Sequence, residues 1–354
     1  MNGFFSFSLF AVQCRQTKQR VLQTEKAFEL EKKYEAKDAH LMKLLFVGID
    51  EHQQKRLVVF FLNGNTIWKP LLRWEEKWLM ESRTKDYLSD QYSIERKGND
   101  MEFQWLGNAS AEICCDQTHI LVDPYFQKGN EKQNHLLKEA LFRADLILIT
   151  HPHFDHFNDI KWIADHSSIP IYVGPSGPKI ARRQGVKGNP FLLLKDGLEI
   201  PVGRDASIFV YASRHIEFDD PLKKETLKRV LKPENIRKGV AVGFRAMMFS
   251  MQEDDIFAFE IREQTKSLFL IGSGALKPDV KYPVHPDLFL LAYQGRSDLD
   301  IWSIPILRQI RPKKTLLFHF DDAFPPVSQR VDTTGLTRRI RNVSEAPFGV
   351  WLTV

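Results

Sequence analysis

The sequence predicts an α/β fold that begins near residue 101, and two observations lead to this class. From there onward, short apolar runs alternate with turn residues, and each run has the length and composition of a strand. Helical stretches, such as 131–143 and 298–311, lie between some of these runs. Buried strands covered by helices are the arrangement of a layered α/β domain. The predicted strands are FQWLGNASAEICC, HILVDPYF, DLILIT, IPIYVGP, SIFVYAS, GVAVGFRAMMFS, IFAFEI, SLFLIGSG, LFLLAY and KTLLFHF.

The first hundred residues have a different texture and predict a helical and covering segment at 1–100, in front of the domain at 101–354. Residues 15–43 contain neither Gly nor Pro and predict a helix with one partly apolar side. Two apolar runs within 44–66 predict a pair of strands closed by a Gly and Asn turn. The charged stretch that follows, to about residue 100, is expected to pack as a covering layer. It contains Trp68, Trp74 and Trp78.

The composition excludes several classes of protein. Of the 354 residues, 43% are hydrophobic and 27% charged, which is the balance of a globular chain with a large core. The formal charge of +5 is too small for a dedicated nucleic-acid arm, although it is compatible with an anionic substrate. No run approaches the ~18 apolar residues of a membrane span. The apolar stretch Phe4–Val12 lacks the basic residues and cleavage site of an export signal.

The three cysteines indicate a reducing compartment, and the predicted location is the cytoplasm. Cys14, Cys114 and Cys115 make an odd count without the spacing of a zinc knuckle or a disulfide framework. Cys114 and Cys115 are adjacent in a predicted strand, so we expect small buried side chains.

A cluster of histidines gives the strongest functional signal. The segment ITHPHFDHFN follows the apolar run ADLILIT and contains His151, His153, Asp155 and His156 within six positions. On a tight loop at a strand tip, His151 and His153 are spaced to hold one ion, and Asp155 and His156 to hold another. Imidazole and carboxylate together suit Zn²⁺, and Mn²⁺ or iron fit the same donors. The alternative, helix-capping or surface histidines, accounts poorly for four such residues in so short a segment.

These residues resemble a known family. The H-x-H-x-D-H pattern is similar to the signature of the metallo-β-lactamase superfamily, whose fold is an αββα sandwich with the metal site at one edge. Trp105-Leu106-Gly107 and Leu121-Val122-Asp123-Pro124 resemble segments of the lactonase-like branch, which contains L-ascorbate-6-phosphate lactonase and N-acylphosphatidylethanolamine phospholipase D. HFDDAFPP, at 319–326, resembles an ending in that branch. The resemblance covers about 101–330 and implies a four-layered αββα sandwich with an additional N-terminal segment.

The resemblance implies two further ligands and a role for each acidic residue. His215 would complete the first set with His151 and His153, and His319 would join Asp155 and His156 at a second metal. Asp155 would also orient the attacking water and accept its proton, provided that it lies within hydrogen-bond reach. Asp123 would orient a ligating imidazole, because such rings usually donate their other N–H to a carboxylate. Its alternative role is that of a turn residue before Pro124.

The sequence departs from the family pattern at two positions. Many relatives carry an Asp that bridges the two metals, whereas LFLIGSGALKPD has Ser273 at that place. With Asp155 as the only anionic ligand, two divalent ions would keep a net charge of about +3, so we expect one tight and one labile metal. Asn108 stands where relatives often have His, which bears on substrate contacts more than on metal binding.

The predicted function is that of a metal-dependent hydrolase, which directs a metal-activated water at a small, anionic ester, lactone or phosphoester. Two alternatives stay open: a phosphodiesterase acting on a phospholipid or nucleotide, and a metal-binding protein without turnover, which Ser273 motivates. The expected cofactor is one or two Zn²⁺ ions, and the expected partner is a small-molecule substrate. We expect no nucleic-acid partner and no transmembrane span, and a homo-oligomer is left open.

Overall fold

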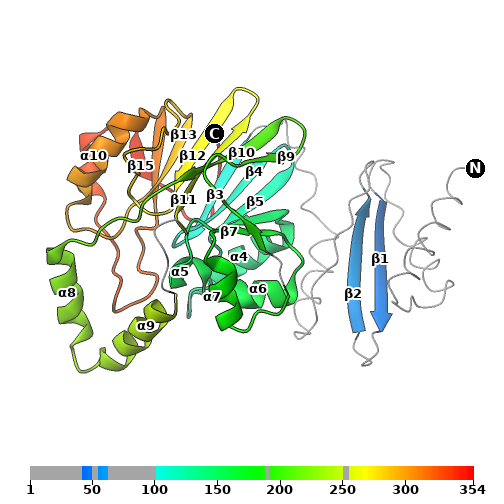
Figure 1. Cartoon of the computed structure of the whole chain (residues 1–354), viewed down its shortest axis with the longest axis horizontal. Helices are drawn as coiled ribbons and strands as arrows, with labels where there is room; N and C mark the ends of the chain where they lie inside the picture. The colour runs from blue at the N-terminus through cyan, green and yellow to red at the C-terminus, as the bar shows by residue number, and fades with distance from the viewer. Residues whose placement is uncertain (1–41, 50–54, 63–100, 189–190, 250–254) are drawn as a thin grey trace, which may run out of the picture. The chain divides into compact units, whose positions relative to one another are not determined.

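The computed structural model describes residues 42–49, 55–62, 101–188, 191–249 and 255–354 (Figure 1). The first two of these ranges form an antiparallel pair of strands, β1 (Met42–Ile49) and β2 (Lys55–Leu62). This pair agrees with the two apolar runs at 44–66. The helix predicted at 15–43 and the tryptophan-rich stretch lie, almost entirely, outside the described residues. The other strands of the described residues form two seven-stranded sheets.

The first sheet is mixed and runs in the order β16-β3-β4-β5-β6-β7-β8. Its antiparallel part joins β16 to β5, and its parallel part runs from β5 to β8. The strands are β3 (Glu102–Gly107), β4 (Ser110–Cys115), β5 (Thr118–Val122), β6 (Leu146–Leu148), β7 (Ile171–Val173), β8 (Phe191–Leu193) and β16 (Trp351–Thr353).

The second sheet runs in the order β15-β14-β13-β12-β11-β10-β9 and is also mixed. Strands β12 to β15 are parallel, whereas β9 to β12 pair antiparallel. The strands are β9 (Glu199–Val202), β10 (Ala206–Ala212), β11 (Phe257–Glu263), β12 (Lys266–Ile271), β13 (Leu288–Ala292), β14 (Lys314–Phe318) and β15 (Val343–Glu345).

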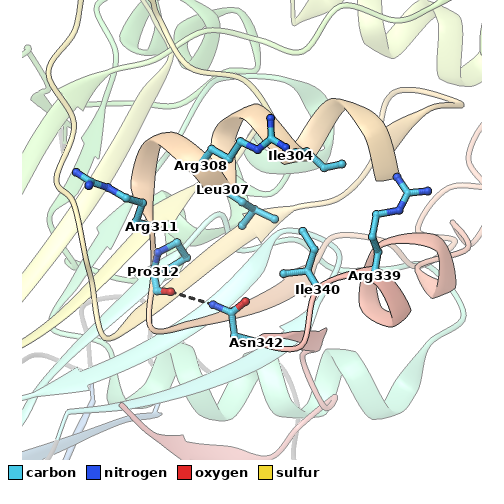
Figure 2. Close-up of a pocket in the computed structure, with 8 residues that line it drawn as sticks. All are labelled: Ile304, Leu307, Arg308, Arg311, Pro312, Arg339, Ile340 and Asn342. Carbon is cyan, nitrogen blue, oxygen red and sulfur yellow. Dashed lines mark hydrogen bonds between the residues drawn. The ribbon is translucent and has the colours of Figure 1, made fainter.

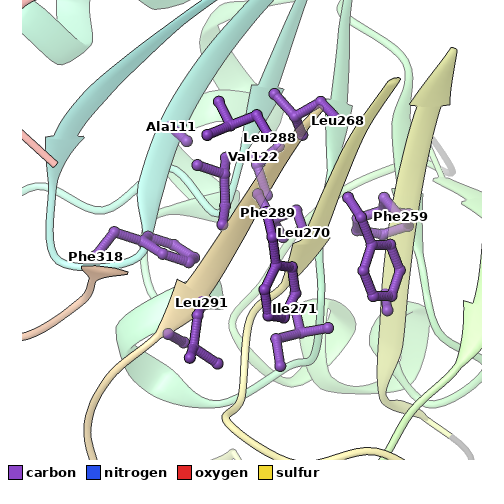
Figure 3. Close-up of a cluster of buried hydrophobic side chains, with 14 of the residues drawn as sticks. Ala111, Val122, Phe259, Leu268, Leu270, Ile271, Leu288, Phe289, Leu291 and Phe318 are labelled. Atoms are coloured by element: carbon purple, nitrogen blue, oxygen red, sulfur yellow. The ribbon is translucent and has the colours of Figure 1, made fainter. Parts of the chain in front are cut away.

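The sheets pack face to face over one apolar cluster. Ala111 and Val122 reach it from the first sheet, and Leu270 and Phe289 from the second (Figure 3). Every residue of β13 is buried, as expected for a strand covered on both faces. This packing explains why these strands appear in the sequence as continuous apolar runs without alternation.

Helices cover the outer face of each sheet. On the first sheet, α4 and α6 contribute Leu137 and Ile160 to a second apolar cluster, which also contains Ile147 of β6. On the second sheet, α10 and α11 bury Ile310 and Leu336. The four layers confirm the predicted αββα sandwich. The covering helices are α4 (Glu131–Arg143), α5 (Phe154–Phe157), α6 (Ile160–His166), α7 (Gly177–Arg183), α10 (Leu299–Ile310) and α11 (Thr334–Arg339).

Two local predictions were wrong. The run at 239–250, expected as a strand, lies mostly in a helix, α9 (Ile236–Met248), which follows another helix, α8 (Asp220–Val230). An apolar run of this length does not separate strand from helix by its pattern, and the helix begins before the run, at Ile236. FQWLGNASAEICC is two strands, since the chain reverses between β3 and β4 at Asn108, which has a positive φ of 48°.

Other predictions agree with the described structure. The helical stretches at 131–143 and 298–311 correspond to α4 and α10. Cys114 and Cys115 are buried and form no disulfide, while Cys14 lies outside the described residues. Among the helices of the described ranges, none combines the length and apolarity that crossing a bilayer requires.

Candidate metal centre

The candidate ligands lie where strands of both sheets end at a common edge. His151 follows β6, His215 follows β10, and His319 follows β14 directly. Polar groups on loops after strands are positioned by the rigid sheets below them. The sheets also meet here, because the Phe257 N–H donates to the Thr150 carbonyl over 2.8 Å. A Cβ at Gly272 would collide with the Thr150 side chain, so only glycine permits this close approach.

The first group consists of His151, His153 and His215. Their donor atoms lie within 4.8 Å of one another. The ring centroids of His151 and His153 are 4.7 Å apart, and that of His215 lies 5.2 Å and 4.6 Å from them. Three imidazoles from two distant segments therefore converge, as the resemblance implied.

The second group consists of Asp155, His156 and His319, whose donor atoms also lie within 4.8 Å of one another. Asp155 Oδ2 is 3.5 Å from Nε2 of His156 and 3.4 Å from Nε2 of His319. The short helix α5 places Asp155 and His156 in its single turn. The ring centroids of His151 and His156 are 3.9 Å apart, so the two groups lie next to each other.

Asp123 and Thr150 orient the rings of His151 and His156. His156 Nδ1–H donates to Asp123 Oδ2 over 2.8 Å, and the Thr150 hydroxyl donates to the same oxygen over 2.5 Å. Because this hydroxyl donates to Asp123, its oxygen accepts from Nδ1–H of His151 at 3.0 Å. In both rings Nδ1 is engaged in these hydrogen bonds, which leaves Nε2 as the atom directed at the candidate metal position. Asp123 therefore has the orienting contact implied by the resemblance, and Thr150 is a contact that the sequence reasoning missed.

The hydrogen bonds of the imidazole nitrogens show whether the two groups of residues fit a metal ion. His151 Nε2 is buried and has no hydrogen-bond partner among the described residues. His215 Nδ1–H donates to the Ile216 carbonyl over 2.7 Å, which leaves its Nε2 as the ligating atom. Buried polar groups normally have partners, and a nitrogen without one at a cluster of imidazoles fits an ion. The donor set, five imidazoles and one carboxylate, suits Zn²⁺, Mn²⁺ or iron.

The electrostatics of the first group favour neutral imidazoles. Burial, together with the neighbouring histidines, lowers the pKa of His151 well below its usual value and lowers the pKa of His153 to about 3. Burial also lowers the pKa of His215, against the opposing effect of its hydrogen bond to Ile216. Neutral imidazole is the form that binds metal, so ligation would displace few protons from this group.

The second group carries opposite charges. Burial would raise the pKa of Asp155, but His156 and His319 hold it below its usual range, so the carboxylate is ionised. Burial would lower the pKa of His156, but Asp155 and Asp123 raise it. A cation bound here would therefore compete with a proton on His156.

Ser273 and Asn108, the two residues that depart from the family pattern, both make hydrogen bonds next to candidate ligands. Ser273 is buried, and its hydroxyl accepts from the Ile216 N–H over 3.1 Å, beside the ligand candidate His215. Asn108 donates from its side chain to the Asp155 carbonyl over 2.7 Å, and its N–H donates to Asp321 over 2.9 Å. Asn108 thus fixes the backbone of Asp155, a role that could not be inferred from the sequence.

Arg214 and Arg296, two arginines near the candidate site, form ion pairs with carboxylates. Arg214 lies 2.7 Å from Glu217, and Arg296 makes two hydrogen bonds to Asp298, of 2.6 Å and 2.9 Å. Both arginines are therefore ion-paired with a neighbouring carboxylate in this structure.

A cavity of about 330 Å³ lies away from the candidate ligands, at the C-terminal end of α10 (Figure 2). Its lining includes Leu307, Arg308, Pro312 and Ile340, and none of the six candidates. The chain enters β14 just after Pro312, whereas His319 follows the other end of that strand.

Comparison with known proteins gives a family and a set of relatives. Residues 113–232 match the metallo-β-lactamase superfamily, a range that includes five of the six candidates. The chain is 23% identical over 235 residues to the "UPF0173 metal-dependent hydrolase" of Methanobrevibacter smithii, covering 65% of this chain and 85% of that protein. It is 34% identical over 88 residues to a "UPF0173 metal-dependent hydrolase" of Koribacter versatilis, covering 25% of this chain and 37% of that protein.

Solved structures with a similar arrangement have low sequence identity to this chain. The metallo-β-lactamase fold protein YhfI from Bacillus subtilis has a TM-score of 0.49 and 11% identity, covering 73% of this chain and all of that one. The metallo hydrolase Igni18 from Ignicoccus hospitalis has a TM-score of 0.47 and 15% identity, covering 72% of this chain and 98% of that one.

Proposed function

Because residues 113–232 match the metallo-β-lactamase superfamily and the domain is an αββα sandwich, we propose that the chain is a metal-dependent hydrolase. The observation that carries the proposal is the convergence of two groups of donor atoms at one edge of the sandwich. The relatives named as metal-dependent hydrolases support the same activity. The lactonase-like branch is a finer assignment and remains part of the proposal.

His151, His153 and His215 would hold one ion, and Asp155, His156 and His319 would hold a second. When bound, a divalent ion supplies water of lowered pKa and polarises the oxygen of the bond to be cleaved. Asp123 and Thr150 keep the imidazoles oriented, so that the chain loses little entropy when an ion binds. Ionised Asp155, at 3.4 Å from His319, has the charge and position to hold the attacking water and accept its proton.

The proposed substrate is a small, anionic ester, lactone or phosphoester. Two divalent ions and one carboxylate ligand leave an excess of positive charge, which an anionic group of the substrate would neutralise. The nearby Arg214 and Arg296 are engaged with Glu217 and Asp298, so the ions themselves would attract the anion. A cytoplasmic location and the absence of a nucleic-acid partner remain part of this proposal, and the oligomeric state is left open.

Metal analysis beside activity tests the proposal. Purified wild type, His151→Ala and Asp155→Ala are analysed for bound metal and assayed on lactones, p-nitrophenyl esters and bis-p-nitrophenyl phosphate. We expect His151→Ala to lose the first ion, and Asp155→Ala to lose most of the second ion and all turnover. His135→Ala is the matched control, because the His135 side chain is 68% exposed and lies outside both groups. Full metal content and rate in both variants would refute the assignment.

Ser273 motivates the second candidate function, a metal-binding protein without turnover. Its hydroxyl is at the position where many members of the metallo-β-lactamase superfamily have an Asp that bridges the two metals. Bound metal without hydrolysis of any substrate in the panel, unchanged by Ser273→Asp, would favour this candidate over the hydrolase.

A further inference from the structure

The two helices that follow His215 form a basic and apolar surface, which we call the α8–α9 surface. Residues 220–240 contain seven Lys and Arg against three Asp and Glu, so this short stretch carries a net charge of +4 out of +5 for the whole chain. In the described residues, eleven large apolar side chains are exposed, and four of them lie within 220–240. They are Leu227, Leu231, Ile236 and Val240.

These side chains lie on the outward sides of the two helices. Leu227 and Leu231 are four residues apart and share one side of α8, with Leu231 61% exposed. Ile236 and Val240 are spaced in the same way along α9, and Val240 is 66% exposed. Helices α8 and α9 form a helical hairpin, and Leu231 and Ile236 flank the short connection between them. The leucine pair of α8 and the Ile236–Val240 pair of α9 are therefore both close to this connection.

The opposite side of α8 attaches the hairpin to the domain. Arg229 donates to the carbonyls of Pro326 and Val327 over 3.2 Å and 3.0 Å. Arg229 is about half a turn away from both leucines around the helix axis, so its contacts leave them facing outward. A Cβ at Gly239 would collide with Val230, so α9 crosses α8 closely at this point. The helices are thus held as a unit, and Figure 1 shows them projecting from the layers.

We propose that the α8–α9 surface docks reversibly on an anionic lipid bilayer. Leucine and isoleucine flanked by lysine are the composition of helices that lie in the membrane interface, where apolar groups enter the acyl boundary and cations meet lipid phosphates. Lys224 and Lys228 are exposed beside Leu227 and Leu231 and have no ion-pair partner within the described ranges. Both components needed for interfacial binding therefore lie on one face.

Two other binding partners, a nucleic acid and a second copy of the chain, fit the α8–α9 surface less well. A nucleic acid would satisfy the lysines but would leave the exposed leucines in contact with a charged backbone. A second copy of the chain would cover the leucines but would bring two surfaces of net charge +4 together, which costs free energy through like-charge repulsion. The anionic bilayer is the occupant that satisfies both features.

Vesicle sedimentation of the full-length, metal-loaded protein tests the proposal. We expect binding to vesicles of equimolar phosphatidylcholine and phosphatidylglycerol, little binding to phosphatidylcholine alone, and weaker binding as salt increases. The double variant Leu227→Gln/Leu231→Gln should lower the partition coefficient at least about tenfold. The double variant Lys224→Gln/Lys228→Gln should lower it on the order of tenfold on the mixed vesicles.

The matched control replaces exposed apolar side chains elsewhere on the domain, Val284→Gln/Ile301→Gln, and should bind as wild type does. All replaced residues are exposed, and equal thermal transitions of the variants verify that folding is intact. Absence of binding to the mixed vesicles overturns the proposal. Equal binding by wild type and both hairpin variants also overturns it, because another part of the chain must then be responsible. A dimer that Leu227→Gln/Leu231→Gln dissociates, without vesicle binding, would identify a second copy as the occupant.

Discussion

At the scale of single residues, Asp123 has the most contacts that bear on the candidate metal centre. Its side chain accepts from His156 and from both the hydroxyl and the N–H of Thr150, and it has no exposure to solvent. Through Thr150 it also fixes the His151 ring. One carboxylate therefore determines the tautomers of one ligand candidate in each group.

Asp123→Asn should weaken metal binding without removing a ligand. The amide cannot accept at both oxygen positions, so His156 and Thr150 lose part of their support, and we expect metal affinity to fall about 10–100-fold. Competition with a chromophoric chelator measures this affinity. Asp165→Asn, which alters an exposed ion pair with Lys161, is the control and should leave affinity unchanged. Unaltered affinity in Asp123→Asn would mean that the ring orientations do not depend on this carboxylate.

Ser273→Asp should make the second ion bind more tightly. The new carboxylate would stand beside His215 and reduce the positive charge of a two-metal site, and we expect at least about a tenfold gain in affinity for the second ion. Ser273→Ala removes only the hydrogen bond to Ile216 and should not produce this gain. Calorimetric titration of the metal-free protein distinguishes one binding event from two. Equal stoichiometry and affinity in all three proteins would contradict the prediction.

At the scale of elements, a buried ionic cluster joins β4, β5 and α4. Glu112 on β4 has no solvent exposure and accepts two hydrogen bonds from Arg143 of α4, of 2.9 Å and 2.6 Å. His119 of β5 donates to Glu112 over 2.8 Å. Burial alone would lower the pKa of His119, but its hydrogen bonds to Cys114 and Glu112 raise it to about 9. The cluster connects the first sheet to the helix that covers it.

The stabilising effect of His119 should depend on pH. Its pKa is near 6.5 when unfolded and about 9 when folded, so its contribution is fully present below pH 6.5 and is lost as pH rises through 9. The full contribution is on the order of 3 kcal/mol. Urea unfolding of wild type and His119→Gln between these limits measures it, and the difference between the two proteins should shrink as pH rises. A difference that is constant with pH would show that His119 is neutral in the folded protein.

Loss of Arg143 should destabilise the same junction. Arg143→Met leaves Glu112 buried with only His119 as a partner. Breaking a fully buried ion pair costs about 3–5 kcal/mol, and we expect a smaller cost here because the Arg143 side chain is 31% exposed. Thermal unfolding of the variant measures the cost. Arg339→Met is the control, because Arg339 pairs with Asp300 at 3.3 Å on the surface and should contribute little.

At the scale of the whole domain, metal binding should stabilise the fold, because the ligand candidates come from three segments that only the folded sheets bring together. At a hundredfold excess over Kd, an ion that binds only the folded state adds about 2.7 kcal/mol. Chelation should therefore lower the melting temperature by several degrees, and the shift should disappear in His151→Ala/His319→Ala. Calorimetry with and without chelator checks this, and a melting temperature insensitive to both metal and chelator would contradict it.

The sequence by itself determined the α/β fold class and the four ligand-type residues of 151–156, and the resemblance implied the αββα layers. Strands covered on both faces require continuous apolar runs, and a dense run of ligand-type residues has few structural explanations. It did not determine that α9 is a helix, because a short apolar run is compatible with either a strand or a helix. It also did not determine that the chain turns at Asn108. The resemblance implied His215 and His319, and the tertiary structure brings their donor atoms beside those of 151–156. Only the tertiary structure shows that Thr150 and Asn108 support these residues and that the α8–α9 surface is exposed. Each of these depends on contacts between segments far apart in the chain, which local pattern does not encode.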